Sequence, residues 1–217
     1  AVIDFRKNSR LAPPSVATAT KNSTRTALKK RAAVIEEFGE ARWQELRRAG
    51  REARLHALMH LNRYLEMVET KVTAAGGRVH WARNAEEARQ IVLGIASTHD
   101  VQSIVKAKSM VSEEIDLNPA LEAHGIKTYE TDLGEFIVQL AGQHPSHITA
   151  PALHMTKEEI ADLFRDKLGI DARPVPEELT EFARQRLRRE FLNAGMGISG
   201  GNFLIAETGT LLIVTNE

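Results

Sequence analysis

The spacing of apolar residues changes character about a third of the way along the chain. From residue 21 to 76, apolar positions recur at steps of three and four, which predicts amphipathic helices. Two successive glycines at positions 76 and 77 then end the pattern. Residues 1–20 instead contain a proline pair and many small polar residues, so we expect an extended or mobile arm there.

Beyond residue 77, short apolar runs alternate with helical patterns. Runs at 78–81, 103–106 and 126–130 predict strands, and the stretches between them predict helices. This succession is typical of βαβ units with a mostly parallel sheet. Near the end, two apolar runs flank a turn at 207–209, which predicts a hairpin whose glycine takes a positive φ.

These patterns predict a division of the chain into three parts. The arm covers residues 1–20, the helical segment covers 21–76, and an α/β domain covers 77–217. The last residues follow an apolar strand directly, and an uncovered sheet edge is an unusual place for a domain to end. We therefore expect this α/β domain to be incomplete at its C-terminus.

Composition excludes several classes of protein. The 29 basic and 29 acidic residues balance to a net charge of zero, which argues against a broad basic face for nucleic acid. The sequence has no run of about 18 apolar residues and no apolar stretch typical of a secretory signal, so we expect a cytoplasmic protein without a membrane span. With no cysteine, these residues form no disulfide and no thiolate-ligated metal or iron–sulfur site.

Candidate chemistry gathers where the strand at 103–106 turns directly into a helix start. Backbone N–H groups point outward at such a junction, and α/β proteins often place ligand sites there. A small carboxylate would need donors, which the sequence offers at Lys106, Lys108, Ser109, Met110, Ser112, Thr208 and Gly209. A proton acceptor would be supplied by Glu113, Glu130 or Glu207. The alternative for Glu113 is structural, since acidic residues in a first helical turn also complement the helix dipole.

Histidines offer two weaker candidates for a metal site. His56 and His60 stand four apart on a predicted helix, but no third ligand lies near them in sequence. The second set is His144, His147 and His154, which has no adjacent carboxylate and reads as a set of loop residues. We therefore predict no metal ligand among these residues.

Three motifs in order carry a resemblance to a known family. They are Lys106-Ala107-Lys108-Ser109-Met110-Val111-Ser112-Glu113-Glu114, then Glu130-Thr131-Asp132-Leu133-Gly134-Glu135, then Ala206-Glu207-Thr208-Gly209-Thr210. Together they resemble the LUD domain, and more closely the LutB-type lactate-utilisation iron–sulfur proteins. The resemblance implies a three-layer α/β/α fold like that of the sugar-phosphate isomerase and CoA-transferase superfamily.

The resemblance also implies a function. Family members take part in oxidising L-lactate to pyruvate together with other lactate-utilisation subunits, and their full-length chains carry cysteine-bound [4Fe–4S] clusters in a C-terminal region. That cofactor cannot be assigned to any of these residues, because the sequence has no cysteine. Two alternatives stay open: a non-catalytic assembly module of a multi-subunit complex, or an isomerase or acyl transferase acting on a phosphorylated or CoA substrate.

Overall fold

The computed structural model describes residues 14–147 and 150–214 of the chain. Within these residues the chain forms two compact units. We call residues 14–26 and 93–199 the sheet unit, and residues 27–92 and 200–214 the helical unit. Helix α2 (Pro14–Phe38) and helix α5 (Ala85–Thr98) each run from one unit into the other.

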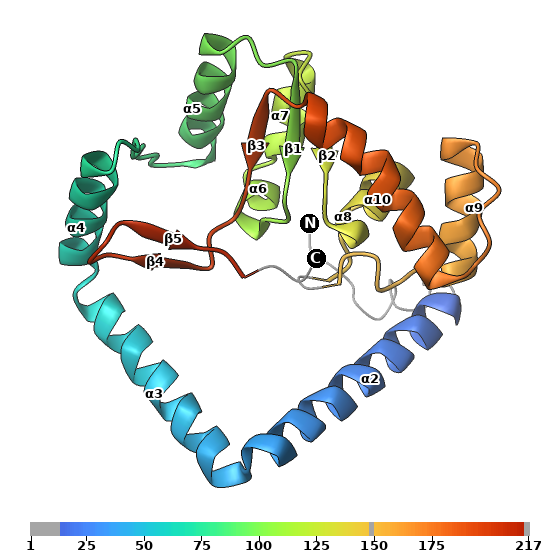
Figure 1. The fold of residues 1–217 in the computed structure, drawn as a ribbon, viewed down its shortest axis with the longest axis horizontal. Coiled ribbons are helices and arrows are strands. Elements are labelled where there is room, and N and C mark those ends of the chain that lie inside the picture. Colours follow the sequence, from blue (N-terminus) through green and yellow to red (C-terminus); the bar gives the residue numbers. More distant parts are fainter. Residues whose placement is uncertain (1–13, 148–149, 215–217) are drawn as a thin grey trace, which may run out of the picture. The chain divides into compact units, whose positions relative to one another are not determined.

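The sheet unit is built on three parallel strands (Figure 1). Strand β1 (Ser103–Lys106) lies between β2 (Lys127–Glu130) and β3 (Met196–Ile198). Helix α10 (Pro176–Asn193) crosses one face of this sheet, and α6 (Met110–Glu114) and α7 (Leu117–Ala123) lie on the other. The predicted α/β class with a parallel sheet and α/β/α layers is therefore confirmed.

A cluster of buried apolar residues in the sheet unit lies between its last three helices. Helix α8 (Leu133–Ala141) packs against α9 (Lys157–Leu168), with α10 completing the cluster. The rings of Phe136 and Phe164 meet edge to face with centroids 6.0 Å apart. The buried members are Phe136, Ile137, Ala161, Phe164, Ala172, Leu179, Ala183 and Leu187.

Local capping signals explain where several helices begin and end. Thr156 and Glu159 form a reciprocal capping box at the start of α9, and Gly169 ends that helix in the left-handed conformation. The side chain of Asn84 accepts from the Glu87 backbone N–H at 2.9 Å, at the start of α5. Asp132 caps α8 in the same way. All three caps are local interactions between residues three positions apart.

The helical unit contains α3 (Glu40–Met59), α4 (Leu61–Ala74) and an antiparallel hairpin of β4 (Phe203–Ile205) and β5 (Thr210–Leu212). Gly39 separates α2 from α3 with a φ of 78°. Gly209 has a φ of 72° in the hairpin turn, as predicted. A Cβ built on Gly209 would lie 2.8 Å from the Val72 backbone nitrogen, so close packing on α4 also requires glycine here.

Two expectations need correction. The extended arm predicted for residues 1–20 is helical from Pro14 onward, because proline is tolerated at the first helical turn and no breaker follows until Gly39. Residues 1–13 lie outside the described residues. The strand predicted at 78–81 is irregular, since no neighbouring strand pairs with it in the described sheet. The third strand is instead β3, from the glycine-rich stretch before the hairpin.

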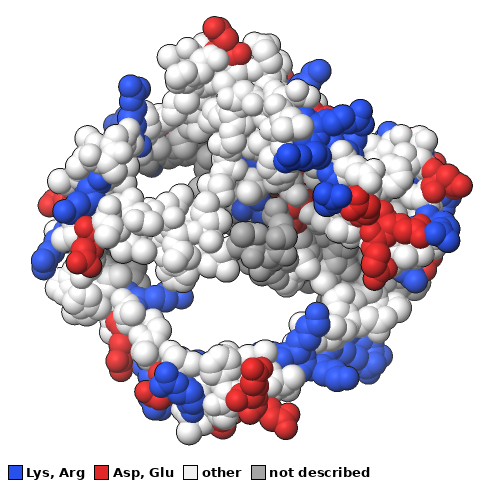
Figure 2. All heavy atoms as spheres, viewed as in Figure 1, with Lys and Arg blue, Asp and Glu red and all other residues white. Residues whose placement is uncertain are grey.

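Figure 2 shows basic and acidic side chains interspersed over the visible face, as expected from the balanced composition. On α10, Glu177 and Glu178 lie in the first turn, where negative charge complements the helix dipole. None of the helices within 14–147 and 150–214 has both the length and the apolar character needed to cross a bilayer.

Candidate functional site

The candidate site lies where two parallel strands of the sheet unit end. Lys106 is the last residue of β1 and Glu130 the last of β2, and the two are paired in register. Both strands end at the same edge because they run in parallel, and α6 and α8 begin shortly after this edge. Side chains that are 24 positions apart in sequence therefore meet here.

Lys106 is the centre of a buried polar cluster. Its side chain is 1% exposed, and its Nζ lies 2.7 Å from Glu130 Oε1, 3.0 Å from Ser112 Oγ and 3.4 Å from Glu113 Oε1. An ammonium group has three hydrogens, so these three acceptors satisfy it. The positive charge is thus already engaged by protein carboxylates.

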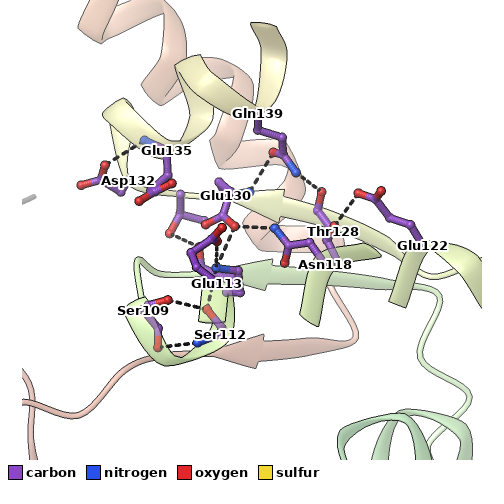
Figure 3. Close-up of polar contacts among 12 residues, drawn as sticks. Ser109, Ser112, Glu113, Asn118, Glu122, Thr128, Glu130, Asp132, Glu135 and Gln139 are labelled. Atoms are coloured by element: carbon purple, nitrogen blue, oxygen red, sulfur yellow. Dashed lines mark hydrogen bonds and ion pairs between the residues drawn. The ribbon is translucent and has the colours of Figure 1, made fainter. Parts of the chain in front are cut away.

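The Glu130 side chain and backbone are fixed by neighbours on two other helices (Figure 3). Asn118 on α7 donates from Nδ2 to Glu130 Oε1 at 2.6 Å. The Glu130 backbone N–H donates to Gln139 Oε1 on α8 at 3.1 Å, and Gln139 Nε2 donates to the Thr128 carbonyl at 2.9 Å. The cluster is therefore held from β1, β2, α6, α7 and α8.

A cleft of about 710 Å³ opens beside this cluster, lined by α6, α7, the end of β2, α8 and residues 142–147. Its volume lies in the usual range for small-molecule sites. No lysine or arginine is among the described lining residues. Six carboxyl groups line it instead: Glu113, Glu114, Asp116, Glu122, Glu130 and Glu135.

Three buried acceptor atoms on the lining residues have no hydrogen-bond partner within the described part of the chain. They are Glu130 Oε2, Glu135 Oε1 and Asn118 Oδ1. Glu130 is 2% exposed and Glu135 is 3% exposed. Buried polar atoms almost always have a partner, so three such atoms at one cleft mark a place where ordered water or a ligand completes the network.

The surroundings of Glu135 favour its neutral form. Burial raises its pKa to about 7, and the negative charges of Glu130 and Glu113 act in the same direction. Burial also raises the pKa of Glu130, and this outweighs the opposing effect of the Lys106 ammonium. A carboxyl group that titrates near neutral pH is suited to taking up or releasing a proton.

The structure brings many of the predicted site residues to this edge. Met110, Ser112, Glu113 and Glu130 line the cleft, whereas Lys106 lies behind it. Ser109 caps α6, where its side chain accepts from the Ser112 backbone N–H at 3.4 Å. Lys108, Ser109 and Met110 stand at the β1–α6 junction and are partly buried. The roles assigned to all these residues stay predictions.

Glu207, Thr208 and Gly209 belong to the helical unit, at the turn of its hairpin. Thr208 Oγ1 donates to Thr210 Oγ1 at 2.8 Å within that turn. Their convergence with the cluster around Lys106 stays a prediction.

Sequence reasoning missed Asn118, Glu135 and Gln139 as site residues. A signal for two of them existed: Glu135 and Gln139 stand four apart in an otherwise apolar helix, which places both on one face. Asn118 had no comparable signal, because its role depends on α7 packing beside β2.

The described residues contain no group of three histidine, aspartate or glutamate side chains arranged to hold a metal ion. His144 and His147 are exposed at the rim of the cleft. The ring nitrogens of His154 instead lie 2.8 Å from Ser146 Oγ and 2.7 Å from Gln143 Oε1. Two of the three loop histidines therefore border the cleft, and His154 contacts residues of the segment that does.

Comparison with known proteins gives this geometry a context. The sequence profile of the LUD domain matches residues 65–217. "Lactate utilization protein B" of Bacillus pumilus (strain SAFR-032) is 46% identical over 189 residues, which is 87% of this chain and 40% of the relative. The protein of the same name from Shouchella clausii (strain KSM-K16) is 49% identical over 176 residues, or 81% of this chain and 37% of the relative. This chain thus spans about 40% of the length of these relatives. No solved structure matches it.

Proposed function

This chain belongs to the LUD domain family, and we propose that it takes part in lactate utilisation. One observation carries this proposal: 46–49% identity, over more than four fifths of the chain, to curated relatives named Lactate utilization protein B.

The finer proposal is that the whole protein contributes to oxidising L-lactate to pyruvate, and that the cleft of the sheet unit receives the substrate. In this oxidation the hydroxyl proton passes to a base. The hydrogen on the carbon that bears the hydroxyl leaves with the electron pair of its C–H bond, as a hydride equivalent, to an acceptor outside these residues. Glu135 is the best placed base, because it lines the cleft and titrates near pH 7.

The [4Fe–4S] clusters implied by the resemblance do not fit these residues. Such clusters are held by cysteine thiolates, and the sequence contains none. The proposed part of this chain in the reaction is therefore limited to binding, orientation and proton transfer.

A phosphorylated or CoA substrate is less compatible with the cleft. A phosphate group carries more negative charge than a carboxylate and is normally held by lysine, arginine or a helix N-terminus. The described lining carries six carboxyl groups and neither lysine nor arginine, although the start of α6 also borders it, and the one buried lysine nearby is already paired. This favours the lactate proposal over the isomerase or acyl-transferase alternative.

The proposal is tested in the organism that carries the gene. Deleting the full-length gene should abolish growth on L-lactate and leave growth on glucose unchanged. The intact gene should restore growth, and Glu135→Gln should not. Glu114→Gln is the matched control, because Glu114 is an exposed carboxyl lining the same cleft. Normal growth of the deletion strain on L-lactate would refute the role in lactate utilisation. Restoration by Glu135→Gln would leave the assembly-module alternative standing.

A further inference from the structure

Residues at the inner end of the cleft carry buried hydrogen-bond acceptors without a donor among the described residues. Glu130 Oε2 and Glu135 Oε1 have no donor among the described residues, and Asn118 Oδ1 is in the same situation. The orientation of the Asn118 amide follows from chemistry, because its Nδ2 donates to a carboxylate that can only accept. Its oxygen must therefore be the atom left without a partner.

A site lined with hydrogen-bond acceptors favours ligands that carry hydrogen-bond donors. A hydroxyl group donates one hydrogen bond and satisfies such a surface, whereas a ketone oxygen only accepts and would face another acceptor. Leaving a buried acceptor unpaired costs about 1–3 kcal/mol. A hydroxy compound should therefore bind this site more tightly than the ketone formed by its oxidation.

We infer that the inner end of this cleft recognises the hydroxyl group of a small hydroxy compound through Glu135, Glu130 and Asn118, and discriminates against the corresponding ketone. This inference rests on the proposed function in one respect: it takes L-lactate as the hydroxy compound and pyruvate as the ketone. Beyond the proposed function, the inference states that the hydroxyl end of the substrate enters first. It also states that the ketone product binds more weakly and is therefore released.

The carboxylate of such a ligand would lie outward. Four of the six carboxyl groups lining the cleft are Glu113, Glu114, Asp116 and Glu122, and an anion held deep among the six would be repelled. The outer rim at 143–147 carries the exposed His144 and His147. Imidazole N–H groups there can donate a hydrogen bond to a carboxylate.

A metal ion is a poorer occupant of the same space. Glu113 and Glu130 are already paired with Lys106, and the described residues do not provide three ligands in a suitable arrangement. A neutral or singly charged organic molecule with one or more hydroxyl groups satisfies the same acceptors without removing those pairs.

Calorimetric titration of the chain with matched pairs of ligands tests the inference. The pairs are L-lactate with pyruvate and, without the carboxylate, lactamide with pyruvamide. At pH about 8, where most of Glu135 is ionised, we expect each hydroxy compound to bind about tenfold or more tightly than its ketone. Equal binding within each pair, tighter binding of the ketones, or no binding at all would overturn the inference.

A variant sharpens the result. Glu135→Gln replaces one acceptor with an amide that can also donate, so pyruvamide should bind better and the preference should fall toward equality. Glu114→Gln should leave the preference unchanged, and a preference in Glu135→Gln equal to that of the unaltered chain would exclude Glu135 from the contact. Circular dichroism checks that both variants are folded. The titrations of the unaltered chain test the inference even if a variant does not fold.

These outcomes separate the two proposals. If lactamide is preferred over pyruvamide while neither L-lactate nor pyruvate binds, the hydroxyl recognition stands and the lactate assignment fails. If the deletion strain cannot grow on L-lactate but no hydroxy compound is preferred, the role in lactate utilisation stands and this inference fails.

Discussion

Helix α8 has two buried faces with opposite surroundings. On one face Phe136 packs against Phe164 in the apolar cluster. On the other, Glu135 lines the acidic cleft, with Gln139 one turn further along. The two neighbours are almost equally buried, at 7% exposure for Phe136 and 3% for Glu135. Burial alone therefore says little about what a residue contributes.

The two faces act on stability in opposite directions. Burying a phenylalanine side chain stabilises a fold by about 1.5–3 kcal/mol. Ionising Glu135 against a pKa raised from 4.5 to about 7 costs roughly 3 kcal/mol. A carboxyl that destabilises the fold at neutral pH, on a helix that is otherwise apolar, is the kind of conflict between local environment and sequence that marks functional sites.

The largest expected effect lies on the apolar face. Phe164 is fully buried, so Phe164→Ala should lower the free energy of unfolding by about 3–5 kcal/mol, measured by urea unfolding followed by circular dichroism. Phe191→Ala is the control, because Phe191 is 50% exposed on α10 and should change the midpoint little. Similar losses in the two variants would show that the cluster around Phe164 does not stabilise the sheet unit as its packing indicates.

A smaller effect is expected from the charged cluster. Lys106→Met removes the cation that compensates the buried Glu130 and should cost about 3 kcal/mol at neutral pH, by the same unfolding measurement. The double variant Lys106→Met with Glu130→Gln should recover most of that loss, since the fully buried carboxylate is neutralised and the remaining partner, Glu113, is 29% exposed to water.

The exposed pair of Arg184 and Glu181 on α10 provides the control for this cluster. Arg184→Met should leave the unfolding midpoint unchanged, because exposed ion pairs contribute little. If the double variant at Lys106 and Glu130 were as unstable as Lys106→Met alone, the loss would have to come from packing of the lysine stem rather than from charge.

The smallest expected effect is a gain in stability, in the variant Glu135→Gln. The pKa of Glu135 is raised on folding, so the native state binds the proton more tightly and stability falls as pH rises between about 4.5 and about 7. Glu135→Gln removes this dependence. It should stabilise the chain by about 1–3 kcal/mol at pH about 8.5 and have little effect at pH about 4.5.

The groups that face Glu135 are Glu130 on β2, Glu113 on α6, Lys106 on β1 and Asp132 at the start of α8. None of them is altered in Glu135→Gln, so the pH-dependent difference reports on Glu135 itself. Thermal unfolding at the two pH values provides the measurement, and an equal change at both would contradict a neutral, buried carboxyl at this position.

Much of the fold was predictable because its signals are local. The capping box of Thr156 and Glu159, the cap by Asn84 and the positive φ of Gly209 each depend on residues within a few positions of one another. The alternation of strand and helix similarly predicted the parallel pairing of β1 and β2. The strand predicted at 78–81 failed because strand formation needs a partner, which a short apolar run cannot reveal.

The sequence by itself placed Lys106 at the end of a strand, Ser109 at a helix start and Glu130 at the end of the next strand. Only the tertiary structure decided that Asn118 and Gln139 would hold Glu130 and that Glu135 would line the cleft rather than face solvent. The physical reason is that patterns along a chain report on neighbours one or two turns away. Which face of α8 meets the cleft depends instead on how that helix packs against α9 and α10, and that is set by contacts between distant segments.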